Sequence, residues 1–235
     1  MKQFELCFAN IEDLDLVSKY QIKNMELCTA LELGGLSPDL EMVRLAREKY
    51  DGELSALIRP RPGNFVYSNT EKNYMLAQVK SLIEMEIDGI VVGALTKDYQ
   101  VDVDFIKRLI DQSMGVKICF HRAIDSVEFP LIALDTLVSL QIDRVLSSGK
   151  KTNAIQGLQT LVEYSNHVGD KIEIMAGGGL KFKELEKIIS TPEINRFHGS
   201  LSKLSPSKDP MFGEYLTVDE NELKLVSELF LKMNA

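Results

Sequence analysis

Cysteine is scarce in this chain of 235 residues, which contains only Cys7, Cys28 and Cys119. An odd number of widely spaced cysteines fits reduced thiols better than a disulfide framework, and none stands in zinc-finger spacing. Long apolar runs are also missing, since none approaches the roughly 18 residues that a membrane span needs. The N-terminal stretch from Met1 to Glu5 carries charges and has no signal-peptide hydrophobic region. We therefore expect a cytoplasmic protein that does not enter a membrane.

Positive charge is in short supply as well. The 27 lysines and arginines are outnumbered by 35 acidic residues, which leaves a formal net charge of -8. Such a balance argues against broad binding to nucleic acid or to acidic membranes. Hydrophobic residues make up 45% and charged residues 26%, the usual composition of a globular protein. We expect no nucleic-acid partner, although a local basic site can still bind a small anion.

Eight short strand patterns alternate with helical patterns along the chain. Their starts lie about 20–35 residues apart, which is the size of a βα unit. Strict alternation predicts a parallel sheet. Eight units without a linker rich in Gly, Ser or Pro predict one α/β domain over residues 1–235, a single closed (β/α)8 TIM barrel. A doubly wound open sheet is the alternative. The predicted strands are Lys2–Cys7, Lys23–Cys28, Leu54–Arg59, Asp88–Val92, Val116–His121, Ile142–Leu146, Lys171–Ala176 and Asn195–His198.

Helix starts can also be predicted from capping residues. Ser68, with Glu71 three positions later, has the pattern of a capping box. Ser37–Pro38 is typical of an N-cap followed by a proline in the first helical position. Asp219 with Glu222 resembles a second capping box.

Several of the predicted strands alternate polar and apolar residues, whereas strands buried on both faces are usually apolar throughout. The outer helices need apolar partners, so the polar face should point into the barrel, where charges must be paired or hydrated. For Lys117 and Glu173 an interior salt-bridge network remains an alternative. Residues at the strand ends are better placed for a ligand site. The polar-face residues include Glu5, Cys7, Glu26, Cys28, Arg59, Lys117, Cys119, His121, Glu173, Arg196 and His198.

A small internal repeat, Glu-Leu-Cys, ends the first two strands at Cys7 and Cys28. Adjacent strands lie about 4.8 Å apart, so the two sulfurs can approach each other. Paired thiolates are soft donors that suit Cu(I), which makes Cys7 and Cys28 candidate metal ligands. The alternative is that these cysteines are small buried hydrophobic residues.

The stretch Cys119–Asp125 brings a thiol, an imidazole, a guanidinium and a carboxylate to the end of the fifth strand. Here His121 can serve as an acid or as an electrophile, and Asp125 can orient either His121 or Arg122. Glu26 can serve as a general base, because carboxylates in partly dry sites take this role. We predict Glu26, His121 and Asp125 as catalytic residues.

Loops after three strands carry groups that bind anions. Arg59 and Arg61, separated by a proline, can hold a carboxylate or phosphate, unless they form a solvated basic loop. Glycines follow the seventh strand and His-Gly-Ser ends the eighth, where TIM barrels commonly bind phosphate through backbone N–H groups. The predicted ligand-binding residues are Arg59, Arg61, Arg122, Gly177, Gly178, Gly179, His198 and Ser200.

These motifs together resemble the CutC family. Met25–Cys28, followed by Gly34–Pro38, is similar to its ELC…GG(L/T)(T/S)P segment. Pro62 stands where the family has glycine, Asn64 where it has aspartate, and the segment 201–216 does not follow the pattern. The other matching stretches, in chain order up to Ser200, are Ile58–Arg61, Phe65–Ser68, Phe120–Asp125, Val145–Gly149, Gly177–Gly179 and Phe197–Ser200.

The resemblance implies a cytoplasmic TIM barrel linked to copper homeostasis. It further implies Cu(I) binding through cysteines, of which Cys7 and Cys28 are at the matching positions, and assembly into a homo-oligomer, which we take to be a dimer. Three functions stay open at this point. They are copper binding, acid–base catalysis on a small anionic or phosphorylated substrate, and non-catalytic interaction with other proteins.

Overall fold

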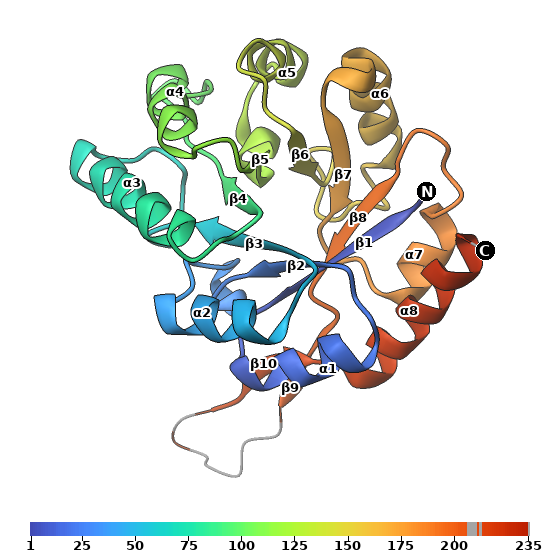
Figure 1. The fold of residues 1–235 in the computed structure, drawn as a ribbon. Coiled ribbons are helices and arrows are strands. Elements are labelled where there is room, and N and C mark those ends of the chain that lie inside the picture. The colour runs from blue at the N-terminus through green and yellow to red at the C-terminus, as the bar shows by residue number, and fades with distance from the viewer. Residues whose placement is uncertain (206–210, 212, 235) are drawn as a thin grey trace.

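A closed barrel of eight parallel strands forms the centre of the molecule, with helices around it (Figure 1). The computed structural model describes residues 1–205, 211 and 213–234. Each strand pairs with the next, and β1 closes the barrel against β8, which confirms the predicted TIM barrel. The strands are β1 Gln3–Phe8, β2 Asn24–Leu27, β3 Glu53–Ile58, β4 Gly89–Val92, β5 Lys117–Phe120, β6 Arg144–Ser147, β7 Glu173–Gly177 and β8 Arg196–Gly199.

Helices connect successive strands and cover the outside of the barrel. None of those in the described part of the chain has the length and apolar character that a membrane span requires. The helices are α1 Leu14–Lys19, α2 Leu40–Lys49, α3 Asn69–Ile83, α4 Val103–Gln112, α5 Pro130–Ser139, α6 Leu158–Val168, α7 Phe182–Ile188 and α8 Glu220–Met233.

The capping predictions meet different outcomes. At α3 the box is present, because Ser68 Oγ accepts from the Glu71 N–H at 3.2 Å and the Glu71 carboxylate accepts from the Ser68 N–H at 2.7 Å. At α2 the prediction was wrong, since Asp39 is the N-cap. The Oγ of Ser37 instead bonds the third strand's loop and α3, accepting from the Arg59 N–H and donating to Gln78.

Only the Asp219 half of the second predicted capping box, before α8, is present. Asp219 does cap the helix, accepting from the Asn221 N–H at 3.0 Å. The Glu222 carboxylate, however, accepts from the Phe182 N–H at 2.8 Å and so ties α8 to the start of α7. A tertiary partner has replaced the local one.

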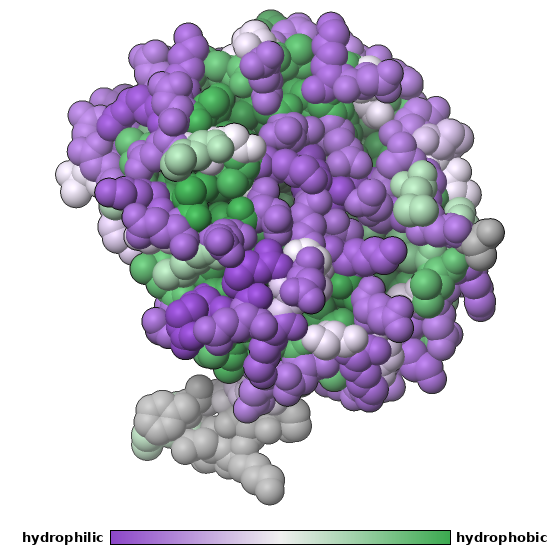
Figure 2. All heavy atoms as spheres, in the orientation of Figure 1, coloured by the Kyte–Doolittle hydropathy of each residue, from purple (hydrophilic) through white to green (hydrophobic). Residues whose placement is uncertain are grey.

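Apolar side chains form two separate clusters, one on each face of the barrel sheet. The larger lies between the sheet and the helices, where each fully buried leucine or phenylalanine contributes about 1.5–3 kcal/mol to stability. Hydrophilic residues cover the middle of the face seen in Figure 2, and apolar ones appear between the outer helices. The smaller cluster lies inside the barrel and consists of Cys7, Cys28, Leu57, Val91, Cys119, Leu146 and Met175.

Charged residues close the barrel interior at the end where the strands begin. They are the first residues of five strands. Glu173 pairs with Arg144 at 3.1 Å and with Arg196 at 2.9 Å. Glu53 pairs with Arg144 and, at 2.9 Å, with Lys117. Burial alone would raise the pKa of Glu53, but hydrogen bonds from Arg144 and Lys117 outweigh it and bring the pKa to about 2. The interior network considered for Lys117 and Glu173 is therefore present.

Two members of this network were missing from the sequence prediction. Glu53 was placed one residue before the third strand, although the strand begins there. Arg144 lies on the same face of β6 as Leu146, which belongs to the interior cluster. The strand alternation contained the signal for both residues.

The segment that departs from the family pattern includes a hairpin that was not predicted. β9 Ser202–Ser205 pairs antiparallel with β10 Tyr215–Val218. Thr217 donates to the Asp13 carboxylate at 2.8 Å, which fastens β10 to the loop after β1. Residues 206–210 and 212, which belong to the same segment, lie outside the described residues.

Candidate functional site

A cavity of about 290 Å³ opens at the carboxyl ends of the strands, and we call it the mouth cavity. Most of the predicted site residues border it, namely Cys7, Glu26, Arg59, His121, Arg122, Gly178, Gly179, His198 and Ser200. Leu31, Phe65, Leu146 and other neighbours complete the wall. Cys28, Arg61, Asp125 and Gly177 are not among the residues that line it. Residues on or just after all eight strands thus meet at one end of the barrel.

On one side of the mouth cavity lies a group of thiol, carboxylate and imidazole side chains. It consists of Glu5, Cys7, Glu26, Cys28 and His198, and we call it the Cys7 cluster. Strand register places Cys7 opposite Glu26, and Glu5 opposite His198. Cys7 Sγ lies 3.5 Å from Cys28 Sγ and 3.8 Å from a Glu26 oxygen, while His198 Nε2 lies 2.9 Å from the other Glu26 oxygen. The ligand atoms of Cys7, Glu26 and His198 all lie within 4.8 Å of one another.

Three side chains of the Cys7 cluster, Glu5, Cys7 and His198, have raised pKa values. The hydrogen bond to Cys28, burial and the nearby carboxylates raise the pKa of Cys7 well above its usual value. Burial lowers the pKa of His198, but the negative charges of Glu26 and Glu5 outweigh this and the net pKa is raised. Burial also raises the pKa of Glu5, whose Oε1 has no hydrogen-bond partner among the described residues. The Cys7 cluster therefore holds more carboxylate and thiol groups than positive charges, and a bound cation would offset this excess.

His121 lies elsewhere on the cavity wall and is a neutral imidazole. Its Nδ1 accepts the Ala123 N–H at 3.1 Å, so the ring proton is assigned to Nε2. Burial and the positive charge of Arg59 lower its pKa to about 3. Phe65 packs against the ring, with 4.7 Å between centroids. Of the two roles predicted for His121, an electrophile that donates a hydrogen bond fits this environment better than an acid that gains and loses a proton near neutral pH.

Asp125 orients Arg122 and not His121. Its carboxylate accepts from Arg122 Nε at 3.0 Å, from Ser147 Oγ at 2.6 Å and from Ser148 Oγ at 3.0 Å. The backbone N–H groups of Ser148 and Lys150 also donate to it, both at 3.1 Å. Arg122 Nη2 in turn donates to Ser148 Oγ at 2.7 Å. Ser147 ends β6 and Ser148 follows it, and neither serine was among the predicted site residues. Asp125 therefore reaches the mouth cavity only through the guanidinium that it holds.

The two arginines after β3 have different surroundings. Arg59 is buried and its Nη1 donates to three backbone carbonyls, of Leu33, Gly34 and Gly35, at 2.8–3.1 Å. It borders the mouth cavity and also holds the loop after β2 in place. Arg61 lies on the outside, where its Nε donates to Glu71 at 2.5 Å. The structure thus separates two residues that the sequence predicted to act as a pair.

Glycines after β7 and a serine after β8 complete the wall. Gly178 has φ +104° and Gly179 φ +69°, a backbone conformation that side-chain-bearing residues rarely adopt. Gly177 is still part of β7. Ser200 Oγ lies 2.9 Å from Ser202 Oγ. Cys119, which we expected at the same mouth, lies deeper in the interior cluster.

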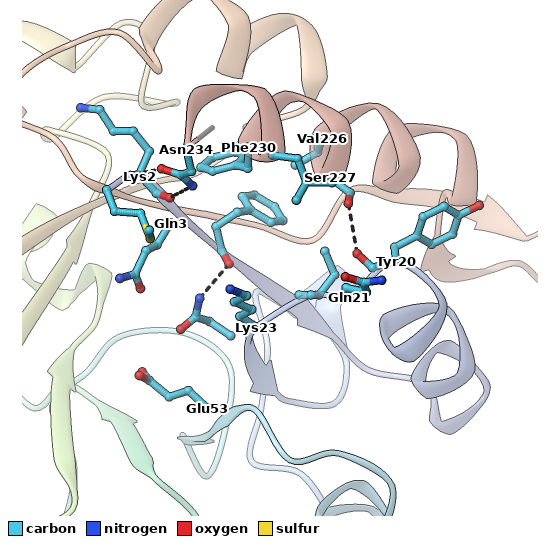
Figure 3. Close-up of a pocket in the computed structure, with 15 residues that line it drawn as sticks. Lys2, Gln3, Tyr20, Gln21, Lys23, Glu53, Val226, Ser227, Phe230 and Asn234 are labelled. Atoms are coloured by element: carbon cyan, nitrogen blue, oxygen red, sulfur yellow. Dashed lines mark hydrogen bonds between the residues drawn. The ribbon is translucent and has the colours of Figure 1, made fainter.

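A larger cavity, of about 720 Å³, lies at the opposite end of the barrel between β1 and α8 (Figure 3). Hydrogen bonds tie its walls together, since the Asn234 amide donates to the Lys2 carbonyl at 2.8 Å and Ser227 donates to the Tyr20 carbonyl at 3.0 Å. No cysteine and no histidine is among the described residues that line it. The thiol and imidazole groups of the predicted site gather at the smaller mouth cavity.

Comparison with known proteins assigns the family. The family model described as CutC family matches residues 2–203. A family protein CutC from Photobacterium profundum is 34% identical over 205 residues, which are 87% of this chain and 84% of that protein. The mouse protein named copper homeostasis protein cutC homolog is 32% identical over 196 residues, 83% of this chain and 72% of that one.

A solved structure gives the same result. The crystal structure of CutC from Streptococcus agalactiae has a TM-score of 0.81 and 29% sequence identity, and the match covers 85% of this chain and 99% of that one. The family motifs at Met25–Cys28 and Phe120–Asp125 lie on the strand ends that form the mouth cavity. The chain therefore belongs to the CutC family.

Proposed function

We propose that this protein binds Cu(I) and takes part in copper handling. The observation that carries the proposal is the 3.5 Å separation of the Cys7 and Cys28 sulfurs. Soft sulfur donors in a buried position favour Cu(I) over harder cations. Glu26 and His198 stand beside Cys7 and could complete the coordination. The name of the mouse relative, a copper homeostasis protein homolog, supports the same role.

Proton release should accompany this binding. The raised pKa of Cys7 means that its thiol is protonated at neutral pH when no metal is bound. A thiolate is the form that ligates metal, so the ion must displace the proton. The apparent affinity for Cu(I) should therefore increase as the pH rises.

Titration with Cu(I) against a competing chelator tests the proposal. We expect the wild-type protein to take the metal from the chelator and the Cys7→Ser/Cys28→Ser double variant to fail. Cys119→Ser is the matched control, because it removes a third buried thiol that does not border the mouth cavity. Unchanged affinity in the double variant would refute the site.

A second candidate function is acid–base catalysis on a small anionic substrate. It is favoured by the hydrogen bond between Glu26 and His198 at the wall of the mouth cavity, 2.9 Å long. Glu26 would serve as the base, and His198 would hold its carboxylate in place. Glu26→Gln should abolish turnover and leave substrate binding within about tenfold, because positioned acid–base groups contribute about 10²–10⁴ in rate. Loss of binding equal to the loss of turnover would argue against this role.

Location and assembly belong to the same proposal. We expect the protein to act in the cytoplasm as a homodimer, with the mouth cavity open to small molecules and without nucleic-acid partners. A purely interacting, non-catalytic protein is the third candidate, and no surface among the described residues identifies its partner. Light scattering at several protein concentrations tests the dimer, and a monomer at all of them would exclude it.

A further inference from the structure

The wall opposite the Cys7 cluster offers hydrogen-bond donors that lack acceptors. His121 is 5% exposed, borders the mouth cavity, and its Nε2 has no partner among the described residues. Because Nδ1 already accepts the Ala123 N–H, Nε2 carries the proton and can only donate. An unpaired buried donor costs about 1–3 kcal/mol, so this atom calls for an acceptor from a ligand.

Arg122, the next residue, adds a charged donor to the same cavity. Asp125 and Ser148 hold its Nε and Nη2, at 3.0 Å and 2.7 Å, and so fix the plane of the guanidinium. Nη1 has no hydrogen bond within the described part of the chain. A Cβ built on Gly178 would lie 3.3 Å from this Nη1 and 3.4 Å from Cζ, so the guanidinium packs closely against this glycine.

The backbone beside Arg122 is open as well. Neither Gly178 nor Gly179 donates its N–H to an acceptor among residues 1–205, 211 and 213–234. Both residues have positive φ and both border the mouth cavity. Backbone N–H groups in such conformations form concave sites for anions. Arg59 also borders the cavity, and its Nε has no partner among the described residues, but its Nη1 and Nη2 already donate to backbone carbonyls. The end of the Arg122 guanidinium is therefore the better-placed charge for a ligand.

We propose that this wall binds the oxyanion group of a small organic acid, a carboxylate or a phosphate. Arg122 Nη1 and the N–H groups of Gly178 and Gly179 would hold the anion, and His121 Nε2–H would donate to a carbonyl or hydroxyl oxygen beside it. The ligand would then lie between these donors and Glu26 on the other wall. This inference names the substrate class of the second candidate function and does not depend on copper.

The cavity limits the size of the ligand. Its volume of about 290 Å³ lies at the lower end of the range of ligand pockets, roughly 300–1,000 Å³. A metabolite of a few carbons with one anionic group fits this space, whereas a dinucleotide does not. The neutral state of His121 suits the role, since a donor that keeps its proton can polarise a carbonyl without transferring charge.

Calorimetric titration with inorganic phosphate, glycolate and 2-phosphoglycolate at low ionic strength tests the proposal. Glycolate and phosphate separate the carboxylate and phosphate sources of the anion, and 2-phosphoglycolate carries both groups. We expect at least one probe to bind the wild-type protein and Arg122→Gln to weaken it tenfold or more. Arg61→Gln is the matched control, because it removes an arginine that does not border the cavity.

Two further comparisons test the backbone and the imidazole. Gly178→Ala should weaken binding, whereas Gly115→Ala, at φ +88° with open space around it, should not. His121→Asn should weaken 2-phosphoglycolate, and His121→Gln, which keeps an N–H near the Nε2 position, should restore part of the affinity. Thermal melting of each variant confirms that it is folded.

The possible results separate the inference from the functions proposed above. No heat from any of the three probes, or equal losses in Arg122→Gln and Arg61→Gln, would overturn the anion site. Binding that depends on Arg122, in a protein without turnover on any tested acid, supports the site and counts against the enzyme candidate. Arg122→Gln should still take Cu(I) from the chelator, because Arg122 supplies no ligand atom to the Cys7 cluster.

Discussion

Acidification should destabilise this protein through His121, and the size of the effect can be worked out. The folded-state pKa is about 3, whereas an unperturbed histidine titrates near 6.5. Between these values the unfolded chain binds a proton that the folded chain does not, so stability falls as the pH falls. Each pH unit below 6.5 costs about 1.36 kcal/mol, so a change from pH 7 to pH 5 should cost about 2 kcal/mol.

The effect is isolated by comparing the wild type with His121→Asn. Asn places an acceptor near the Nδ1 position, so the hydrogen bond from the Ala123 N–H can persist without a titrating ring. Other groups with shifted pKa, Glu5 and His198 among them, contribute in both proteins and cancel in the difference. Urea denaturation at pH 7, 6 and 5 gives the free energy of unfolding of each protein.

We expect the wild type to lose about 2 kcal/mol more than His121→Asn between pH 7 and pH 5. His167→Asn is the control, because this histidine lies at the surface beside Asp135 and not in the mouth cavity. This variant reports the effect of replacing a histidine by asparagine outside the mouth cavity. If His121→Asn and the wild type lose stability in parallel, His121 titrates normally in the folded protein and the reasoning about its buried neutral state is wrong.

Three other predictions concern the frame that supports the site. Arg144→Met should lower the free energy of unfolding, measured by urea denaturation, by about 3 kcal/mol. The substitution leaves the Glu53 carboxylate with fewer positive partners at the end of the barrel where the strands begin. Wild-type Glu53 stabilises above pH 4.5 and loses this contribution as the pH falls toward about 2, so the variant should show a smaller acid loss in that window. Ser68→Ala should cost about 1 kcal/mol in thermal melting through the lost cap, and no change would mean that α3 does not need it. Gly157→Ala should cost about 1–3 kcal/mol in urea, because its Cβ would lie 1.9 Å from the Ser148 carbonyl oxygen; full stability would show that this loop can shift.

The sequence alone determined the barrel and the end at which the site lies. Period-two alternation within short strands, separated by helical patterns, left few other ways to bury the apolar face. The same alternation marked Glu26, His121 and His198 as inward residues at strand ends. Local signals succeeded where the partner is also local, as in the capping box at Ser68 and Glu71.

Tertiary structure decided which polar residues meet. Asp125 had two possible partners in sequence, and Ser147 at the end of β6 and Ser148 just after it hold its carboxylate beside Arg122. Arg59 and Arg61 are two residues apart and would share a face if the strand continued. One points into the barrel mouth and the other lies on the surface, because β3 ends at Ile58 and the chain bends from Pro60 onward.

Charge and proton states also depended on the closed barrel. The pKa of His121 follows from burial and from Arg59, which lies on a different strand end. The Glu222 carboxylate does not form the predicted capping bond, because it accepts the N–H of Phe182 on another helix. A pattern in one segment specifies which face a side chain takes, but the neighbours across that face come from β-strands and loops far away in the sequence, and only the folded barrel brings them together.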